Sequence, residues 1–251
     1  MKSVTLVKIG GIFGIFLGIL NVITFFTTLF LGELKIFGLY VPEMMLQLYE
    51  PNMINYYTLD MILYILTGIF WFLFSLAIIV YSKRYKSKIG AATGAIACIN
   101  GLLALEFGIL LWYIIQTQDI LILKKIIPYS IFVLLHYEIF LFIFSILTIP
   151  YFVKIRKKIG TIGGILLILG GIPSLFMSIF VYYGLASYSL FALVPYKLHE
   201  ILHLFAFVAL FAFILFSALI ALPLRTIGLI LCGVSTFLFR EEEKTITIKV
   251  S

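Results

Sequence analysis

Long apolar runs separated by short polar connections make up most of the chain. A helix needs about 20 apolar residues to cross the roughly 30 Å of hydrocarbon in a bilayer. Six runs reach that length, at residues 9–31, 59–81, 89–115, 130–153, 159–183 and 199–222. A seventh run, 227–239, is shorter and covers about 20 Å as a helix. The pattern therefore predicts six transmembrane helices and a short seventh span.

The composition excludes a soluble protein. Of the 251 residues, 63% are hydrophobic and 12% are charged, whereas roughly 25% of the residues in a soluble domain are charged. The mean hydropathy of +1.21 also excludes a disordered, collagen-like or disulfide-stabilised chain. The two cysteines, Cys98 and Cys232, both lie in apolar runs and form no disulfide framework. We expect an all-α integral membrane protein with a single polytopic domain, 1–251.

The placement of lysine and arginine predicts the orientation, because connections rich in these residues face the cytoplasm. One side of the predicted bundle carries many cations and no acid: Lys2, Lys8, Lys83, Arg84, Lys86, Lys88, Lys154, Arg156, Lys157, Lys158 and Arg225. We expect a cell-membrane protein with a cytoplasmic N-terminus. The basic connections also suit anionic lipid headgroups. No aromatic platform or nucleic-acid motif accompanies them, so nucleic-acid binding is not expected.

A lysine–isoleucine–glycine sequence recurs where predicted helices enter the membrane. It stands at 8–10, 88–90 and 158–160, and Arg225 opens a similar segment. We infer three tandem helical hairpins in parallel orientation, followed by a truncated half-repeat and a polar tail. The hairpins are 8–87, 88–157 and 158–224, the half-repeat is 225–239 and the tail is 240–251.

Glycines four residues apart mark the first helix of each predicted hairpin. They are Gly10, Gly14 and Gly18, then Gly90 and Gly94, and then Gly160 and Gly164. Small residues at this spacing share one helix face and let two backbones approach closely. We expect these faces to pack inside the bundle. Self-association, or contact with other membrane proteins through the same faces, is the alternative.

Three residues fit a zinc-binding motif. His199, Glu200 and His203 form H-E-x-x-H, which on a helix places both imidazoles on one face. The motif resembles the signature of zinc metalloproteases, including the membrane-embedded site-2 proteases. This resemblance implies a zinc ion and a catalytic role for Glu200. It covers five residues, and no acidic ligand follows His203 in an apolar run. A third ligand would have to come from His136, Glu138 or Glu106.

Most of the ionisable residues within the predicted spans gather in one layer. His136 and His203 each lie about 33 Å along a helix from the next basic boundary. Glu106, Glu138 and Glu200 lie near the same level. Charged side chains within a membrane usually face the bundle interior or water, and they are functional candidates.

Four interpretations of this layer stay open. A metal site would use His136, His199 and His203 with Glu138. A haem would be held by His136 and by His203 or His199 as axial ligands. A proton or substrate pathway would use Glu106 and Glu138 with histidine relays. In the fourth interpretation, His–Glu pairs only lock helices together.

The function expected from these features is that of a non-enzymatic membrane component in the lipid bilayer. It would be a channel, a carrier or a translocation subunit, or a scaffold within a membrane complex. Little chain is left for a soluble domain, and no nucleotide-binding motif is present. The alternative is a metal- or haem-binding membrane protein, either an enzyme or an electron carrier. A channel or carrier would need a polar cavity that extends past Asn21 or Asn100.

Overall fold

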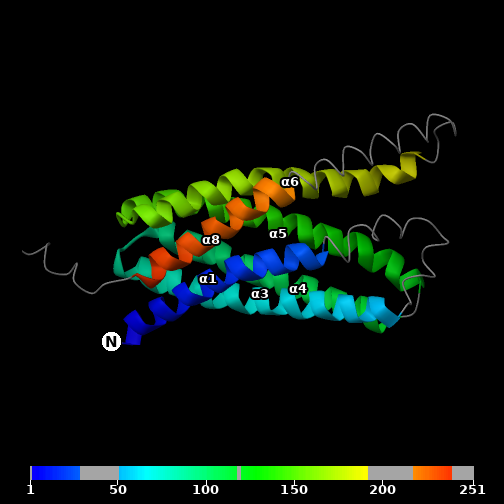
Figure 1. Cartoon of the computed structure of the whole chain (residues 1–251), viewed down its shortest axis with the longest axis horizontal. Helices are drawn as coiled ribbons and strands as arrows, with labels where there is room; N and C mark the ends of the chain where they lie inside the picture. The colour runs from blue at the N-terminus through cyan, green and yellow to red at the C-terminus, as the bar shows by residue number, and fades with distance from the viewer. Residues whose placement is uncertain (1, 29–50, 118–119, 192–216, 239–251) are drawn as a thin grey trace, which may run out of the picture.

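All the regular structure in the described part of the chain is helical (Figure 1). The structure is a computed structural model, and it describes residues 2–28, 51–117, 120–191 and 217–238. The long helices are α1 (Lys2–Thr28), α3 (Pro51–Arg84), α4 (Lys88–Gln116), α5 (Ile120–Lys154), α6 (Lys158–Phe191) and α8 (Leu222–Phe237). A π-helical turn, η4 (Ser217–Ala221), leads directly into α8.

Six stretches within the described helices are long and apolar enough to cross a bilayer. They are Val4–Thr24, Thr58–Arg84, Lys88–Gln116, Phe132–Lys154, Lys158–Phe176 and Leu219–Phe237. The predicted class is confirmed to this extent: the described chain is all-helical, with six helices suited to a membrane. Their length and composition are those of a multi-pass membrane protein whose apolar surfaces contact lipid.

Local chemistry explains where α4 and α8 begin. Ser87, in an extended conformation, precedes α4, and its Oγ accepts a hydrogen bond from the Gly90 amide at 3.1 Å. A serine in this N-cap position satisfies one of the amides that the first helical turn leaves unpaired. Pro223 lies in the first turn of α8, a position at which proline is common because its fixed φ suits a helix.

The α3–α4 and α5–α6 connections have the same backbone conformation, 70 residues apart. Lys86 and Arg156 occupy equivalent positions, with φ values of 47° and 56°. In both connections the amide of the next residue donates to a carbonyl five residues earlier, with N–O distances of 2.9 Å. Both connections lie at the end of the bundle that also holds the N-terminus (Figure 1). We call it the basic end.

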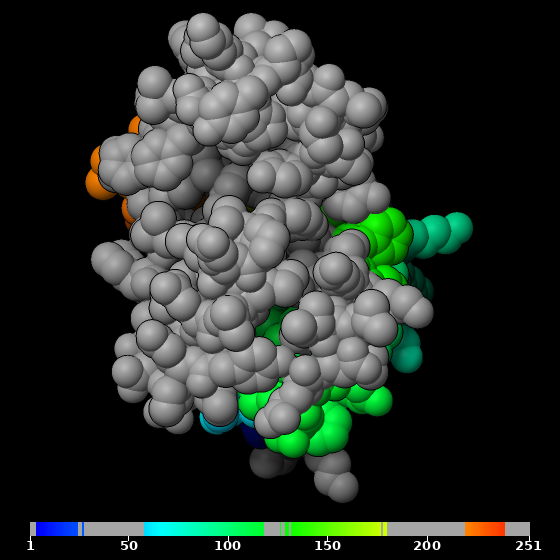
Figure 2. Space-filling view, turned by 90° about the vertical axis from the view of Figure 1, so that its right-hand side faces the viewer, coloured from blue at the N-terminus to red at the C-terminus, as the bar shows by residue number. Residues whose placement is uncertain are grey.

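The six long helices form a closed ring. Each helix packs against its neighbours in the chain, and α8 also packs against α1. In the end-on view of Figure 2, α8 (orange) and the α4–α5 region (green) appear on opposite sides. The ring therefore closes through α1 and α8, which are far apart in the sequence and lie side by side (Figure 1).

Aromatic side chains fill the middle of the ring. Trp71 and Phe74 of α3 and Phe144 of α5 are almost completely buried. The rings of Trp71 and Phe144 lie 5.1 Å apart and nearly perpendicular, an edge-to-face arrangement that their quadrupoles favour. Leu17 of α1 and Leu167 of α6 belong to the same buried cluster. The core thus joins helices from different parts of the chain.

The beginning of α8 differs from the sequence prediction. The separate short span expected at 227–239 is instead part of a helix that starts at Leu222 and has the apolar stretch Leu219–Phe237. The physical reason is Arg225, whose charge resembles a membrane boundary in the sequence but is paired inside the bundle. The span expected at 199–222 lies mainly outside the described residues.

The direction of α8 also differs from the prediction of a helix that leaves the basic end. Gly11, near the start of α1, lies against Phe237 at the end of α8. Gly18, two turns further along α1, lies against Thr226 near the start of α8. The two helices are therefore antiparallel, and α8 runs toward the basic end.

Candidate functional site

An ion pair between α5 and α8 lies inside the ring. An Nη atom of Arg225 is 3.1 Å from Oε1 of Glu138, and the two side chains are 9% and 12% exposed. Glu138 lies about 24 Å along α5 from Lys154 at the basic end. Arg225 lies about 18 Å along α8 from Phe237. Both charges therefore lie within a hydrocarbon layer of roughly 30 Å, in the half that is farther from the basic end.

The burial of this ion pair makes it a functional candidate. Removing a charge from water costs several kcal/mol, and the attraction between two buried charges offsets that cost only with good geometry. Here a single contact joins one guanidinium nitrogen of Arg225 to one oxygen of Glu138. The Nε of Arg225 is buried without a hydrogen-bond partner in the described structure. The contact is thus less complete than a bidentate pair, in which two parallel hydrogen bonds form.

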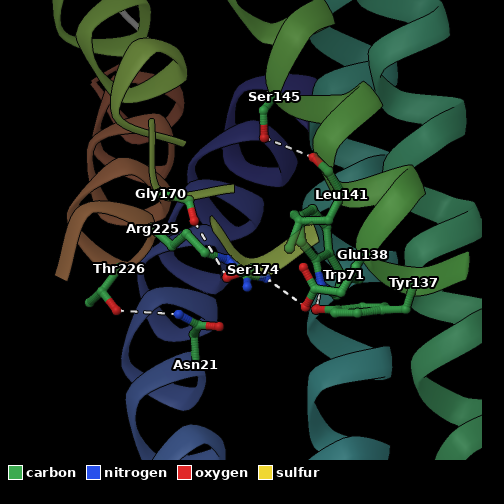
Figure 3. Close-up of polar contacts among 10 residues, drawn as sticks. All are labelled: Asn21, Trp71, Tyr137, Glu138, Leu141, Ser145, Gly170, Ser174, Arg225 and Thr226. Atoms are coloured by element: carbon green, nitrogen blue, oxygen red, sulfur yellow. Dashed lines mark hydrogen bonds and ion pairs between the residues drawn. The ribbon is translucent and has the colours of Figure 1, made fainter. Parts of the chain in front are cut away.

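Gly170 of α6 makes room for the arginine. A Cβ at Gly170 would lie 2.7 Å from Cγ of Arg225 and 2.6 Å from a carbonyl oxygen of η4. The hydroxyl of Ser174 donates to the Gly170 carbonyl at 3.4 Å. Pro173, which has no N–H to donate, lies within α6 at this point. Figure 3 shows the Arg225 side chain passing this part of α6 on its way to Glu138.

Further polar groups lie inside the ring, and Figure 3 shows those near the ion pair. Nδ2 of Asn21 donates to the hydroxyl of Thr226, the residue after the arginine, at 3.3 Å. Nε1 of Trp71 donates to the hydroxyl of Tyr137, the residue before the glutamate, at 3.1 Å. Asn100 of α4 is fully buried, and its amide atoms have no hydrogen-bond partner among the described residues. The inside of the ring therefore holds polar groups as well as its aromatic core.

Glu106 has a different partner from Glu138. Glu106, on α4, accepts a hydrogen bond from the hydroxyl of Tyr129 on α5 at 2.5 Å. Tyr129 is exposed and precedes the apolar stretch Phe132–Lys154. The hydrogen bond to Glu106 raises the pKa of the Tyr129 phenol, because the neutral phenol donates it and the carboxylate repels a phenolate. The two glutamates are thus engaged in separate contacts.

His136 also has a separate environment from Glu138. Its Nδ1 lies 2.8 Å from the carbonyl oxygen of Phe132 on its own helix. Its ring contacts the ring of the exposed Phe132, with centroids 4.0 Å apart. Residues two apart on a helix do not face each other, and Glu138 is engaged by Arg225. The structure therefore does not bring His136 and Glu138 together.

The remaining members of the predicted metal or haem site lie outside the described residues. They are His199, Glu200 and His203. Within the described ranges, no three histidine, cysteine or acidic side chains are grouped so that they could hold a metal ion. A zinc or haem site that includes 199–203 therefore stays a prediction.

The predicted glycine faces lie at contacts between helices of the same chain. A Cβ added at any of these glycines would come within 3 Å of a side-chain or backbone atom of another helix. The neighbouring helices are α3 for Gly10 and Gly94, α3 and α8 for Gly14, α8 for Gly18, α3 and α5 for Gly90, and α5 for Gly160 and Gly164. Gly233, which the four-residue spacing does not single out, lies against the backbone of Gly11 and Gly14.

Arg225 is the main site residue that the sequence pattern misplaces: the pattern puts it at a membrane boundary, whereas the structure puts it inside the ring. It is the only residue among aspartate, glutamate, lysine and arginine within 201–239, just as Glu138 is within 126–153. Two isolated opposite charges in apolar segments favour pairing with each other, because an unpaired charge in hydrocarbon is costly. This isolation is the sequence signal for the ion pair.

Comparison of the chain with protein-family models, curated proteins and solved structures gives no match. Its function is therefore argued from the chemistry of the ion pair and its surroundings.

Proposed function

We propose that the chain is a non-enzymatic membrane carrier or channel for a small solute, with the Arg225–Glu138 pair at its binding site. The observation that carries this proposal is a buried ion pair within two membrane-spanning stretches, in which Nε of Arg225 has no described partner. A buried ion pair often stabilises a protein no better than apolar residues of similar volume would, so stability alone does not explain why the pair is there. Ionisable residues within membranes commonly mark substrate or ion pathways.

Irregular helices beside the ion pair support a transport role. Pro173 interrupts the hydrogen bonding of α6, and η4 replaces the α-helical turn before α8. Discontinuous helices commonly form the substrate sites of membrane carriers, and π-helical turns are frequent at functional sites. Here both irregularities lie in elements that contact Arg225 or the residues next to it.

The proposed arrangement in the membrane has a cytoplasmic basic end and three tandem hairpins. The matching conformations of the α3–α4 and α5–α6 connections, 70 residues apart, support repetition. With α8 directed toward the basic end, the hairpins are α1–α3, α4–α5 and α6–α8. The cations of both connections support the cytoplasmic assignment.

Uptake into reconstituted vesicles tests the transport proposal. Radiolabelled lactate, rubidium and alanine represent a small anion, a cation and a zwitterion. We expect saturable uptake of at least one of them above the level of protein-free vesicles. The matched variant carries both Arg225→Leu and Glu138→Leu, which removes the two charges together and leaves neither unpaired. We expect this variant to lose the uptake.

Two results would contradict a carrier or channel role for this site. One is a wild-type protein that takes up none of the three solutes. The other is a double variant that retains full uptake. Circular dichroism and size-exclusion chromatography of both proteins establish that they are folded. The first result favours a scaffold, in which the ion pair only holds α5 and α8 together.

A further inference from the structure

We propose that the Arg225 site accepts a small monocarboxylate together with one proton, which Glu138 takes up. This inference rests on the proposed function and names the solute class for the same site. It follows from three features of the described residues: the donor that Arg225 leaves unused, the close packing around the arginine, and the charge balance of the pair.

The guanidinium of Arg225 has an unused donor. An arginine carries five N–H donors in a planar fork that matches a carboxylate. Arg225 contacts Oε1 of Glu138 through one Nη atom, and its Nε has no hydrogen-bond partner in the described structure. A second carboxylate that approaches the Nε edge can form the bidentate pair that Glu138 does not form.

Close packing around Arg225 limits the size of a ligand. A Cβ at Gly170 would already meet Cγ of Arg225 at 2.7 Å, and Pro173 leaves α6 with one fewer backbone hydrogen bond. Asn21 and Thr226 add a polar contact on the next residue of α8 (Figure 3). The aromatic core that includes Trp71 fills the ring nearby. A monocarboxylate of a few carbon atoms suits such a narrow site.

Charge balance requires a proton. The Arg225–Glu138 pair has no net charge, so an added carboxylate would leave one excess negative charge inside the bundle. An unpaired buried charge is costly. If one proton binds to a carboxylate oxygen of Glu138, the neutral carboxyl can leave Arg225. Arg225 then pairs with the solute carboxylate instead. One anion and one proton then enter together, and the site stays neutral.

Among the described residues, Glu138 is the proton acceptor best placed to keep the site neutral. Within that part of the chain, the polar side chains near the pair come from several helices and include one other titratable group, the phenol of Tyr137. They are Asn21 of α1, Trp71 of α3, Tyr137 of α5, Ser174 of α6 and Thr226 of α8. Elsewhere on the helices that pack around the site, Glu106 of α4 is bound by Tyr129, and Asp60 lies near the opposite end of α3 from Arg84.

Trp71 provides a fluorescence probe of this site. The chain has two tryptophans, and the second, Trp112, is 48% exposed and outside the polar cluster. In a Trp112→Phe background, the emission therefore reports on Trp71, which donates to Tyr137 beside Glu138. Sodium lactate is titrated into the detergent-purified protein between pH 5.5 and 7.5, with sodium chloride as the control for ionic strength.

We expect a saturable change in Trp71 emission with lactate. The apparent affinity should rise about tenfold for each unit that the pH falls, because binding takes up one proton. In Glu138→Gln, which is permanently neutral, lactate should bind with an affinity independent of pH. In Arg225→Leu, binding should be lost at every pH. Circular dichroism confirms that each variant is folded before titration.

Three results would overturn the inference. They are no saturable response to lactate in the wild type, an affinity that does not change with pH in the wild type, and binding that persists in Arg225→Leu. A misfolded Arg225→Leu variant leaves the comparison between wild type and Glu138→Gln as the deciding measurement. If the vesicles take up rubidium or alanine while lactate does not bind, the carrier proposal stands and this inference fails.

Discussion

At the scale of single residues, Arg225 and Glu138 depend on each other. We expect Arg225→Leu or Glu138→Leu alone to lower the free energy of unfolding by about 3–5 kcal/mol, because each leaves one buried charge unpaired. The double variant should lose less than either single variant. A double-mutant cycle of unfolding in mixed detergent measures the coupling. Additive losses would show that the two charges do not interact.

Tyr129 and Glu106 allow a separate test by titration. The hydrogen bond to Glu106 raises the pKa of the Tyr129 phenol, because a phenolate would lose the bond and face a carboxylate. Glu106→Gln should therefore lower the pKa of Tyr129 toward its ordinary value. NMR of tyrosines labelled at Cζ, with Tyr129→Phe to assign the signal, measures this shift. An unchanged pKa would mean that the hydrogen bond does not form in the membrane protein.

At the scale of helices, close contact between α1 and α8 depends on glycine. A Cβ at Gly233 would lie 2.5 Å from the amide nitrogen of Ile15 and 2.7 Å from the carbonyl oxygen of Gly11. Backbone atoms cannot move aside as a side chain can, so Gly233→Ala should destabilise the protein by about 1–3 kcal/mol. Gly171→Ala is the matched control, because its Cβ would meet only Phe142 at 3.3 Å. Unfolding curves that give the same loss in free energy of unfolding for both variants would contradict this packing.

At the scale of the whole molecule, contact between α1 and α8 closes the ring. The side chains of Asn21 and Thr226 are hydrogen-bonded at 3.3 Å. With Cys98 and Cys232 replaced by alanine, we expect Asn21→Cys and Thr226→Cys to form a disulfide within one chain upon mild oxidation. Thiol counting and gel mobility detect it. The control pair, Asn21→Cys with Tyr129→Cys, should not cross-link, because α1 and α5 are not neighbours in the ring. Similar rates for both pairs would exclude the closed ring.

The orientation of the ring can be measured with a membrane-impermeant maleimide. Lys86→Cys and Arg156→Cys lie in exposed parts of the two basic connections, so both should be labelled only after the cells are permeabilised. Tyr129→Cys, near the opposite end of α5, should be labelled in intact cells. If Lys86→Cys and Arg156→Cys react from different sides, the two connections do not share one face of the membrane.

The sequence predicts much of the fold but less of the site. Apolar runs locate α1, α3, α4, α5 and α6, because membrane-spanning length and hydropathy are properties of each segment alone. The bounds are predicted less well, and α5 begins at Ile120, ten residues before the run 130–153. The same reasoning misplaces the start and direction of α8, since Arg225 resembles a boundary until its partner is known. The sequence identifies Glu138 as a candidate site residue. It does not predict the contact with Arg225, because that contact depends on how α5 and α8 are placed relative to each other.

By itself, then, the sequence determined an all-helical protein suited to a membrane, with basic residues concentrated in short connections. These features follow from hydropathy, length and charge within local segments. Only the tertiary structure decided that α8 closes the ring against α1 and that Arg225 pairs with Glu138. Those contacts join residues 205 and 87 positions apart. The physical reason is that pairing of buried charges and close approach of glycines depend on which helices meet, which no single segment specifies.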